Sequence, residues 1–149
     1  MIIREIQEAN TPKLAELYVS AFSAAPWNEE WQAEWATDRL STIYNLPRFH
    51  GLVLENQHSI IAAALGRSTP FKVSMHFELV EFFVEPTCQS QGIGKRLFKA
   101  LENGLVDRGC SFCTLLTARG TNAEHFYLKL GYRPHGKLIF MNRKLSKES

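Results

Sequence analysis

The sequence predicts one mixed α/β domain spanning residues 1–149. Apolar segments of strand length alternate along it with segments whose apolar residues recur at helical spacing. The composition, 45% hydrophobic and 21% charged, is typical of a globular domain. No internal repeat or low-complexity segment interrupts the pattern. A chain of this length buries roughly 68–70% of its unfolded surface, so it can be stable without disulfides or metals.

The first half of the chain is expected to form two helices between strands. Thr11-Pro12 is a typical helix start, and Ala25-Pro26 should end that helix. A polar turn at residues 56–59 separates two apolar segments, as in an antiparallel hairpin. The expected elements are a strand at 2–7, helices at 11–25 and 29–45, and strands at 49–55 and 60–67.

The second half is expected to contain a central strand and the longest helix. The strand at 77–84 follows Pro70, ends before Pro86, and is apolar at both parities except for Glu78 and Glu81. Apolar residues at every fourth position from Ile93 predict a helix at 92–108. Strands are expected at 111–117 and 137–145, with a short helix at 121–130 that begins with a Thr121-x-x-Glu124 capping box.

The net charge and the short apolar stretches predict a protein that is neither strongly basic nor membrane-spanning. Seventeen Lys and Arg against fifteen Asp and Glu give a net charge of +2, without a run of five like charges. The basic C-terminal residues lack the interleaved aromatics of a nucleic-acid surface. The longest apolar stretch, residues 60–65, is far short of the ~20 residues of a membrane helix, and Arg4 and Glu5 interrupt any leader. We expect a cytoplasmic protein that binds neither nucleic acid nor membrane.

The cysteines and histidines do not predict a metal or disulfide site. Cys88, Cys110 and Cys113 are odd in number. The Cys110-x-x-Cys113 pair lacks a second ligand pair for zinc, and it leads into an expected strand rather than opening a helix. The five histidines show no metal-ligand spacing. We expect buried cysteines and no metal.

The turn between the central strand and the long helix predicts a phosphate-bearing ligand. Glycines at a strand-to-helix turn let backbone N–H groups converge on an anion, beside the partial positive charge of the helix N-terminus. A dinucleotide fingerprint would need glycine at Leu97. A Walker loop would need Ser or Thr at Arg96. A flexible turn without a ligand remains the alternative, although it does not explain Gln89 and Lys95.

Two segments of the chain resemble the GNAT superfamily of acetyl-coenzyme A-dependent N-acyltransferases. Gln89-x-x-Gly92-x-Gly94 resembles its pyrophosphate loop, and residues 122–132 resemble its Asn-x-x-Ala-x-x-Phe-Tyr-x-Lys-x-Gly-Phe segment with a shortened spacing. The order of the expected elements also matches. The resemblance implies a mostly antiparallel central sheet flanked by helices, acetyl-coenzyme A as co-substrate, and a homodimer.

Carried over by position, the resemblance implies a set of cofactor contacts. The loop should bracket the pyrophosphate, and the backbone of the central strand should hydrogen-bond the pantetheine arm. Asn122 is implied as a further pantetheine contact and Tyr127 as the general acid, with a packing tyrosine as the alternative. The implied cofactor-binding residues are Phe82, Phe83, Val84, Gln89, Ser90, Gln91, Gly92, Ile93, Gly94, Lys95, Asn122 and Tyr127.

The implied reaction is direct attack of a primary amine on the acetyl thioester, which needs a base for the amine proton. Glu78 and Glu81 are the candidates, because burial in a strand raises a carboxyl pKa towards neutrality. They lie three residues apart, so a regular strand would place them on opposite faces. Glu81 is nearer the cofactor end, and Glu78 stands where some family members carry a glutamate. A salt-bridged strand residue, with a water-relayed base, is the alternative.

The acceptor site is expected on the second helix. Trp27, Trp31 and Trp35 recur at i, i+4 and i+8 with glutamates between them, and Trp27, Trp31 and Glu30 would form an aromatic, acidic wall for a cationic amine. A buried tryptophan stripe is the alternative. The stretch Pro26-Trp27-Asn28-Glu29 is similar to one in aminoglycoside 6'-N-acetyltransferases.

These observations lead to one expected function and two alternatives. The expected function is acetylation of a primary amine on a small molecule by acetyl-coenzyme A. A binding module that holds an acyl-coenzyme A without turnover needs neither Tyr127 nor a buried glutamate. A protein lysine or N-terminal acetyltransferase would need an open groove rather than a tryptophan-walled pocket.

Overall fold

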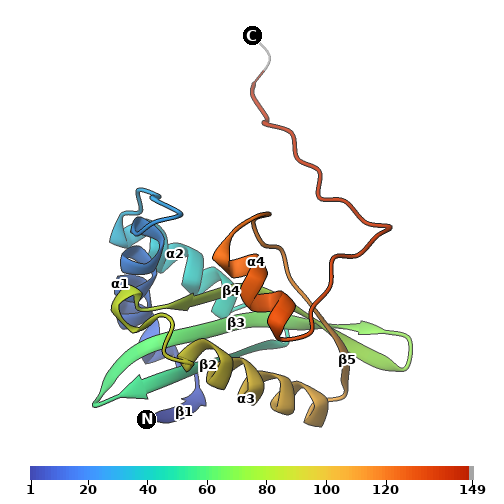
Figure 1. Cartoon of the computed structure of the whole chain (residues 1–149), viewed down its shortest axis with the longest axis horizontal. Coiled ribbons are helices and arrows are strands. Elements are labelled where there is room, and N and C mark those ends of the chain that lie inside the picture. The colour runs from blue at the N-terminus through green and yellow to red at the C-terminus, as the bar shows by residue number, and fades with distance from the viewer. Residues whose placement is uncertain (148–149) are drawn as a thin grey trace. The chain divides into compact units, whose positions relative to one another are not determined.

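The computed structural model describes residues 1–147. They fall into two compact units, Met1–Leu116 and the described residues from Thr117 onward. The first unit contains a five-stranded sheet in the order β1-β2-β3-β4-β5 (Figure 1). β1 to β4 are antiparallel neighbours, and β5 runs parallel to β4. The strands are β1 Ile2–Glu5, β2 Phe49–Asn56, β3 Ser59–Phe71, β4 Ser74–Val84 and β5 Cys110–Thr114. The predicted mixed α/β fold with a mostly antiparallel sheet is confirmed.

Helices cover both faces of this sheet (Figure 1). α1 (Thr11–Ser23) and α2 (Ala33–Tyr44) pack on one face, and α3 (Ile93–Asp107) packs on the other. On the α3 face, the Phe98 ring lies 5.3 Å from that of Phe82. Two short 3-10 helices, Glu8–Asn10 and Pro86–Cys88, precede α1 and α3. No helix among residues 1–147 is both long and apolar enough to cross a membrane.

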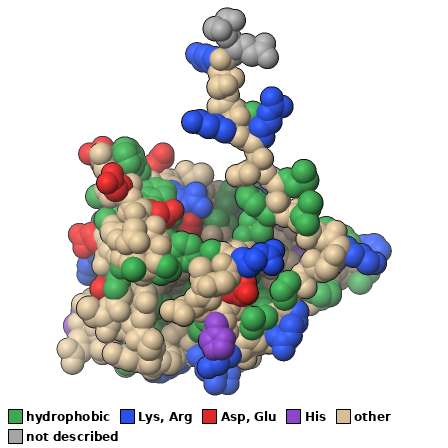
Figure 2. All heavy atoms as spheres, turned by 45° about the horizontal axis from the view of Figure 1, so that its top comes forward, with side chains coloured by type: hydrophobic (Ala, Val, Ile, Leu, Met, Phe, Trp, Pro, Cys, Tyr) green, Lys and Arg blue, Asp and Glu red, His purple; other side chains and the backbone are tan. Residues whose placement is uncertain are grey.

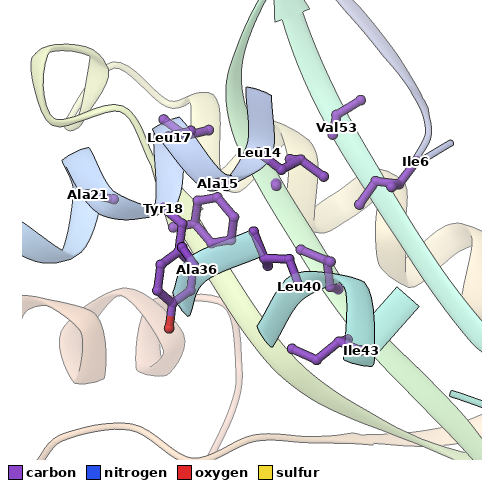
Figure 3. Packing of buried hydrophobic residues seen from close by; sticks show 13 residues of the cluster. Ile6, Leu14, Ala15, Leu17, Tyr18, Ala21, Ala36, Leu40, Ile43 and Val53 are labelled. Atoms are coloured by element: carbon purple, nitrogen blue, oxygen red, sulfur yellow. The ribbon is translucent and has the colours of Figure 1, made fainter. Parts of the chain in front are cut away.

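The core between α1, α2 and the sheet follows from helical spacing of apolar residues (Figure 3). Leu14 and Tyr18 of α1 face Leu40 of α2, and all three are buried. Small residues such as Ala15 and Ala36 let the two helices approach each other closely. The sheet contributes Val53, Ala63, Leu65 and Phe83 to this cluster.

The expected helix at residues 29–45 is too long, because α2 begins at Ala33. Residues before it form a loop in which Asn28 adopts a positive φ of 48° and the Glu29 amide donates to the Phe22 carbonyl at 2.8 Å. This turn folds the chain back on the end of α1, so the helical hydrogen-bond ladder cannot start before residue 33. Trp27, Trp31 and Trp35 therefore do not share one helix, which corrects the predicted tryptophan stripe.

The second unit contains α4 (Asn122–Lys129). The predicted cap is confirmed: Thr121 Oγ1 accepts a hydrogen bond from the Glu124 amide at 3.3 Å. The predicted strand at 137–145 is wrong, because residues 133–147 contain neither helix nor strand and their side chains are exposed. A strand requires a neighbouring backbone to complete its hydrogen bonds, and the described residues of this unit offer none.

Candidate active site

The loop before α3 has the backbone geometry expected of an anion site. Gly92 is the N-cap of α3 and has a φ of 78°, in the left-handed region that favours glycine. No side chain caps this end of the helix, so the first amides of α3 keep their hydrogens for another acceptor. A Cβ added at Gly92 would meet nothing within 4 Å, so the loop leaves open space beside its backbone.

The glutamine side chains hold the loop rather than project from it. Gln89 Nε2 donates to the Val84 carbonyl at 3.3 Å, and Gln91 Nε2 donates to the Thr87 carbonyl at 3.4 Å. Both bonds tie the loop to the end of β4 and to the turn that follows it. Lys95, in the first turn of α3, is exposed and adds positive charge at this end of the helix.

β4 and β5 separate in front of this loop. Their parallel pairing runs from Met75 to Glu78 on β4 and ends at Thr114 on β5. Beyond that point, β4 continues to Val84 paired with β3 alone among the strands of the sheet. Phe82 packs on α3, while Phe83 packs on the rings of α1. The strand separation lies where the predicted pantetheine contacts Phe82, Phe83 and Val84 stand.

Glu81 is the buried carboxylate of this region. Its side chain lies between α1 and α2, and the residue is 7% exposed. Arg39 Nε of α2 donates to Glu81 Oε1 at 2.5 Å, and the Tyr18 hydroxyl of α1 donates to the same oxygen at 3.3 Å. Three elements that are far apart in the sequence therefore converge on one carboxylate oxygen.

The second oxygen of Glu81 remains available. Oε2 accepts no hydrogen bond from a described residue. Within residues 1–147, His50 Nε2 is the one fully buried side-chain nitrogen or oxygen atom without a hydrogen bond. Glu81 Oε2 also lacks a hydrogen bond, so this oxygen is not fully buried and keeps access to solvent. A carboxylate that is held at one oxygen and open at the other is suited to accept a proton.

Burial determines the protonation behaviour of this cluster. It raises the pKa of the Glu81 carboxyl above its ordinary value, while the hydrogen bond and charge of Arg39 act in the opposite direction. Burial and the neighbouring Glu81 carboxylate also raise the pKa of the Tyr18 phenol. Tyr18 is therefore a neutral hydrogen-bond donor throughout the physiological pH range.

A β-bulge in β4 corrects the prediction that Glu78 and Glu81 face opposite sides of the sheet. Glu81 lies opposite Leu65 of β3 and Glu78 lies opposite Arg67, while Val80 is an extra residue between these pairs. Leu65 and Arg67 are two residues apart and point to the same face. Both glutamates therefore face α1 and α2, and they differ in burial: Glu78 is exposed.

The sequence analysis did not connect Arg39 or Tyr18 with Glu81. Tyr18 belongs to the apolar face of α1, and Arg39 belongs to a helix with charged residues on its outer side. No short motif joins either residue to Glu81, since 63 and 42 positions separate them from it. The cluster could have been predicted only from a fold in which α1 and α2 pack over β4.

An open pocket of about 400 Å³ lies at the turn between α1 and α2. It is lined by Ser23, Asn28, Glu29, Glu30, Trp31, Gln32 and Trp35. Trp31 Nε1 donates to Glu29 Oε1 at 3.2 Å, and its ring meets that of Tyr18 edge-on at 4.9 Å. The edge-to-face contact of Trp31 with Tyr18 therefore connects the pocket with the Glu81 cluster.

Trp27 does not line this pocket. Its ring lies 5.8 Å from that of Phe22, and the residue is 38% exposed. The predicted substrate residues Trp31 and Glu30 therefore lie together at the pocket, and Trp27 packs on the end of α1 instead. Trp35, which was not among the predicted substrate residues, completes the aromatic lining.

Tyr127 and Asn122 belong to the second unit. Asn122 is the first residue of α4, and Tyr127 lies near its end. The Tyr127 ring contacts those of Phe126 and Tyr132 edge-on, at centroid distances of 5.3 and 6.0 Å. The Tyr132 amide also donates to the Tyr127 carbonyl at 3.0 Å. This backbone hydrogen bond holds the residues that follow α4 against the end of the helix.

Comparisons with known proteins agree with this architecture. The sequence matches the acetyltransferase (GNAT) family over residues 11–132. No curated protein matches it. The structure of a GNAT family acetyltransferase from Staphylococcus aureus is similar, with a TM-score of 0.73 and 18% identity over 97% of this chain and 98% of that one.

Two aminoglycoside acetyltransferases share the fold. An aminoglycoside antibiotic 6'-N-acetyltransferase from Acinetobacter haemolyticus is 16% identical, with a TM-score of 0.74, over 98% of this chain and 100% of that one. An aminoglycoside acetyltransferase from an uncultured soil metagenomic sample, in complex with sisomicin, is 16% identical, with a TM-score of 0.75, over 97% and 96%. From its match over most of its length, the chain belongs to the acetyltransferase (GNAT) family and is an acetyltransferase.

Proposed function

We propose that this protein transfers the acetyl group of acetyl-coenzyme A to a primary amine of a cationic small molecule, with Glu81 as the base. The observation that carries the proposal is the Glu81 cluster. Its carboxylate is buried, is fixed at Oε1 by Arg39 and Tyr18, and is open at Oε2. A protein that only held the coenzyme would not need such a group.

The residues of the loop fit the pyrophosphate of acetyl-coenzyme A, the co-substrate that GNAT acetyltransferases use. No side chain caps the first amides of α3, the space beside Gly92 is open, and Lys95 adds a positive charge. The segment of β4 beyond Glu78, which β5 does not follow, would accept the pantetheine arm. Asn122 is proposed as a further contact to this arm.

The proposed reaction removes two protons from the substrate ammonium and adds one proton to the coenzyme A thiolate. Glu81 Oε2, directly or through a water molecule, takes the proton of the substrate ammonium, and the neutral nitrogen attacks the thioester carbonyl carbon. The new C–N bond forms as the C–S bond breaks, and the second amine proton leaves to solvent. The departing thiolate takes a proton from the Tyr127 hydroxyl, which is then reprotonated from solvent.

Arg39 and Tyr18 are proposed to position the base. Arg39 offsets part of the burial cost of the Glu81 carboxylate, so the carboxylate can be ionised and still have a raised pKa. A base with a pKa closer to the working pH takes a proton from an amine more effectively than a fully exposed carboxylate does. Glu78, on the same face but exposed, is the second candidate base.

The pocket beside this cluster favours a cationic acceptor. Glu29 and Glu30 supply negative charge, and the rings of Trp31 and Trp35 supply faces on which a cation can rest. Two structures with this fold are aminoglycoside acetyltransferases, and such substrates are polycationic amines. Polyamines and aminosugars are the proposed acceptors. The cytoplasmic location and the homodimer expected from the sequence stay predictions.

The test is release of the coenzyme A thiol from acetyl-coenzyme A across a panel of polyamines, aminoglycosides, amino acids and short peptides. We expect release that depends on polyamines or aminoglycosides. Release with peptides alone would indicate a protein acetyltransferase. Thermal stabilisation by acetyl-coenzyme A without release on any amine would instead support the binding module and contradict the proposed catalysis.

The loop assignment has its own test. We expect Gly92→Val to abolish the thermal stabilisation by acetyl-coenzyme A, because a β-branched side chain is strained at a φ of 78° and fills the open space beside the loop. Gly120→Val is the matched control, since Gly120 has a φ of 75° and a similarly open surrounding outside the loop. Retained stabilisation in Gly92→Val would show that acetyl-coenzyme A binds elsewhere.

A further inference from the structure

The turn between α1 and α2 holds one carboxylate firmly beside the pocket described above. Glu29 lines this pocket, and its amide donates to the Phe22 carbonyl at 2.8 Å. Its Oε1 accepts a hydrogen bond from Trp31 Nε1 at 3.2 Å. The backbone and the side chain of Glu29 are therefore both fixed, so its negative charge has a defined place at the pocket.

A continuous line of contacts leads from Glu29 to the proposed base. The Trp31 ring meets the Tyr18 ring edge-on at 4.9 Å, and the Tyr18 hydroxyl donates to Glu81 Oε1 at 3.3 Å. All four residues belong to the first unit, Met1–Leu116. Tyr18 is buried and Trp31 is half-buried, so protein rather than water fills part of the space between the two carboxylates. Screening of one charge from the other is weaker there than in bulk water.

The charge of Glu29 acts on the Glu81 cluster. Burial raises the pKa of the Glu81 carboxyl, Arg39 lowers it, and the charge of Glu29 raises it by a smaller amount. Figure 2 shows acidic side chains gathered over the part of the molecule that α1 and α2 form. The charged or titratable groups that surround Glu81 or share its face of the sheet are Tyr18 of α1, Arg39 of α2, Glu29 of the turn, Glu78 of β4 and Arg67 of β3.

We propose that Glu29 is a specificity-determining residue: it holds a second cationic group of the acceptor, and this bound charge favours the ionised form of Glu81 at the amine that is attacked. The inference rests on the proposed function and deepens it. The faces of Trp31 and Trp35 line the same pocket and would hold the cation beside Glu29. Diamines and polyamines are then the substrate class, and a monoamine of the same length is a poor acceptor.

The first experiment compares two diamines with monoamines of equal length over a range of pH. The pairs are butane-1,4-diamine with butylamine and hexane-1,6-diamine with hexylamine. We expect kcat/KM for the better diamine to exceed that of its monoamine at least about tenfold, against a statistical factor of about two for its two equivalent amines. The ratio of the two kcat values should grow by about threefold or more from alkaline to acidic pH, because the bound cation lowers the pKa of Glu81.

Glu29→Gln keeps the hydrogen-bond acceptor for Trp31 but removes the charge. We expect the diamine and its monoamine to become equal within about threefold, and the acidic limb of the monoamine profile to move to lower pH. Glu34→Gln is the matched control, because Glu34 is an exposed glutamate at the start of α2 that does not line the pocket. It should keep the wild-type preference. Equal rates in the wild type, or a preference that survives in Glu29→Gln, would overturn the inference.

The second experiment needs no turnover, so it separates this inference from the proposed acetylation. The Glu81 carboxyl is titrated by carbon-13 NMR, with Glu81→Gln for assignment, in tetramethylammonium chloride and in sodium chloride of equal ionic strength. Tetramethylammonium has no N–H to acetylate, and aromatic faces bind such cations. We expect it to move the titration to lower pH in the wild type and in Glu34→Gln, but not in Glu29→Gln.

The outcomes of the titration distinguish the two proposals. A Glu81 titration that does not move with tetramethylammonium would overturn the coupling, even where amines are acetylated. A titration that moves in a protein that acetylates no amine would support the cation site at Glu29 and contradict the proposed function.

Discussion

Glu81 and His50 are buried ionisable side chains on opposite faces of the sheet, with opposite consequences. On the α1 and α2 face, Glu81 accepts hydrogen bonds from Arg39 and Tyr18. On the α3 face, His50 is 6% exposed and its Nε2 has no hydrogen bond. Burial shifts the pKa of both groups towards the neutral form, upward for Glu81 and downward for His50.

The difference between Glu81 and His50 shows that burial alone does not identify a functional group. Arg39 and Tyr18 fix one oxygen of Glu81, and its other oxygen reaches solvent. Glu81 can therefore exchange a proton with a ligand. His50 is closed in beside the Phe77 ring and near Gly104, and it can only add a pH dependence to the stability of the fold. Variants of Glu81, of its partners and of His50 separate these two roles.

Glu81→Gln should have the largest effect. The amide keeps the size of the side chain but cannot accept a proton, so we expect kcat for the amine panel to fall by about 100-fold or more. Steady-state thiol release would measure this, with acetyl-coenzyme A binding retained. His50→Leu, the buried group of the opposite face, should change kcat by less than about twofold. An active Glu81→Gln that loses activity on Glu78→Gln would transfer the role of base to Glu78.

Gly66→Ala should disturb the bulge that brings Glu81 to its face. A Cβ at Gly66 would lie 2.1 Å from the Glu78 carbonyl oxygen and 2.5 Å from the Phe77 ring. We expect a loss of about 1–3 kcal/mol in the free energy of unfolding, measured by urea denaturation. Gly104→Ala is the control, because its Cβ would meet only the His50 ring at 3.7 Å. This helical position should gain up to about 1 kcal/mol.

Arg39→Met should lower kcat by about tenfold at neutral pH. Removing the cation takes away the interaction that opposes the raised pKa of Glu81, so that pKa rises further and the acidic limb of the pH–rate profile moves to higher pH. Arg39→Lys should restore part of the shift. Arg108→Met is matched, since Arg108 is similarly exposed and pairs with Glu5 at 2.8 Å away from Glu81. Equal profiles for Arg39→Met and the wild type would remove Arg39 from this role.

His50→Leu should stabilise the fold, and more so in acid. The pKa of His50 is lowered in the folded state by burial, so the unfolded chain binds the proton more strongly. Stability is then lost as the pH falls below the ordinary histidine value of about 6.5. We expect a gain of about 1 kcal/mol at pH 5 and a smaller one at pH 8, measured by urea unfolding. His58→Leu, at an exposed turn, should show no such pH dependence.

Tyr18→Phe should have the smallest effect. The phenol donates one neutral hydrogen bond of 3.3 Å to Glu81, so we expect kcat to fall by about threefold with the core packing retained. The ring contacts to Phe22, Trp31 and Phe83 do not use the hydroxyl. A loss as large as that of Glu81→Gln would instead give the hydroxyl a direct part in proton transfer.

Much of this molecule was determined by its sequence alone. The mixed α/β fold follows from the alternation of strand-length apolar segments with segments of helical periodicity. Hydrophobic period and turn residues can be read from neighbouring residues, without knowledge of the tertiary structure. The glycine loop at residues 89–95 is also local, since its backbone geometry depends on Gly92 and on the start of α3. The second segment, residues 122–132, carries its own cap and helix. These features lie in contiguous residues, and they were sufficient to indicate the family.

The tertiary structure decided which residues act together. The bulge at Val80 depends on the register between β3 and β4, and it moved Glu78 and Glu81 to one face against the period-two expectation. Arg39 and Tyr18 reach Glu81 only because two helices pack over that face. The predicted strand at 137–145 failed for the same reason: its apolar pattern is local, but its hydrogen bonds need a neighbouring strand, and pairing is a property of the fold rather than of the segment.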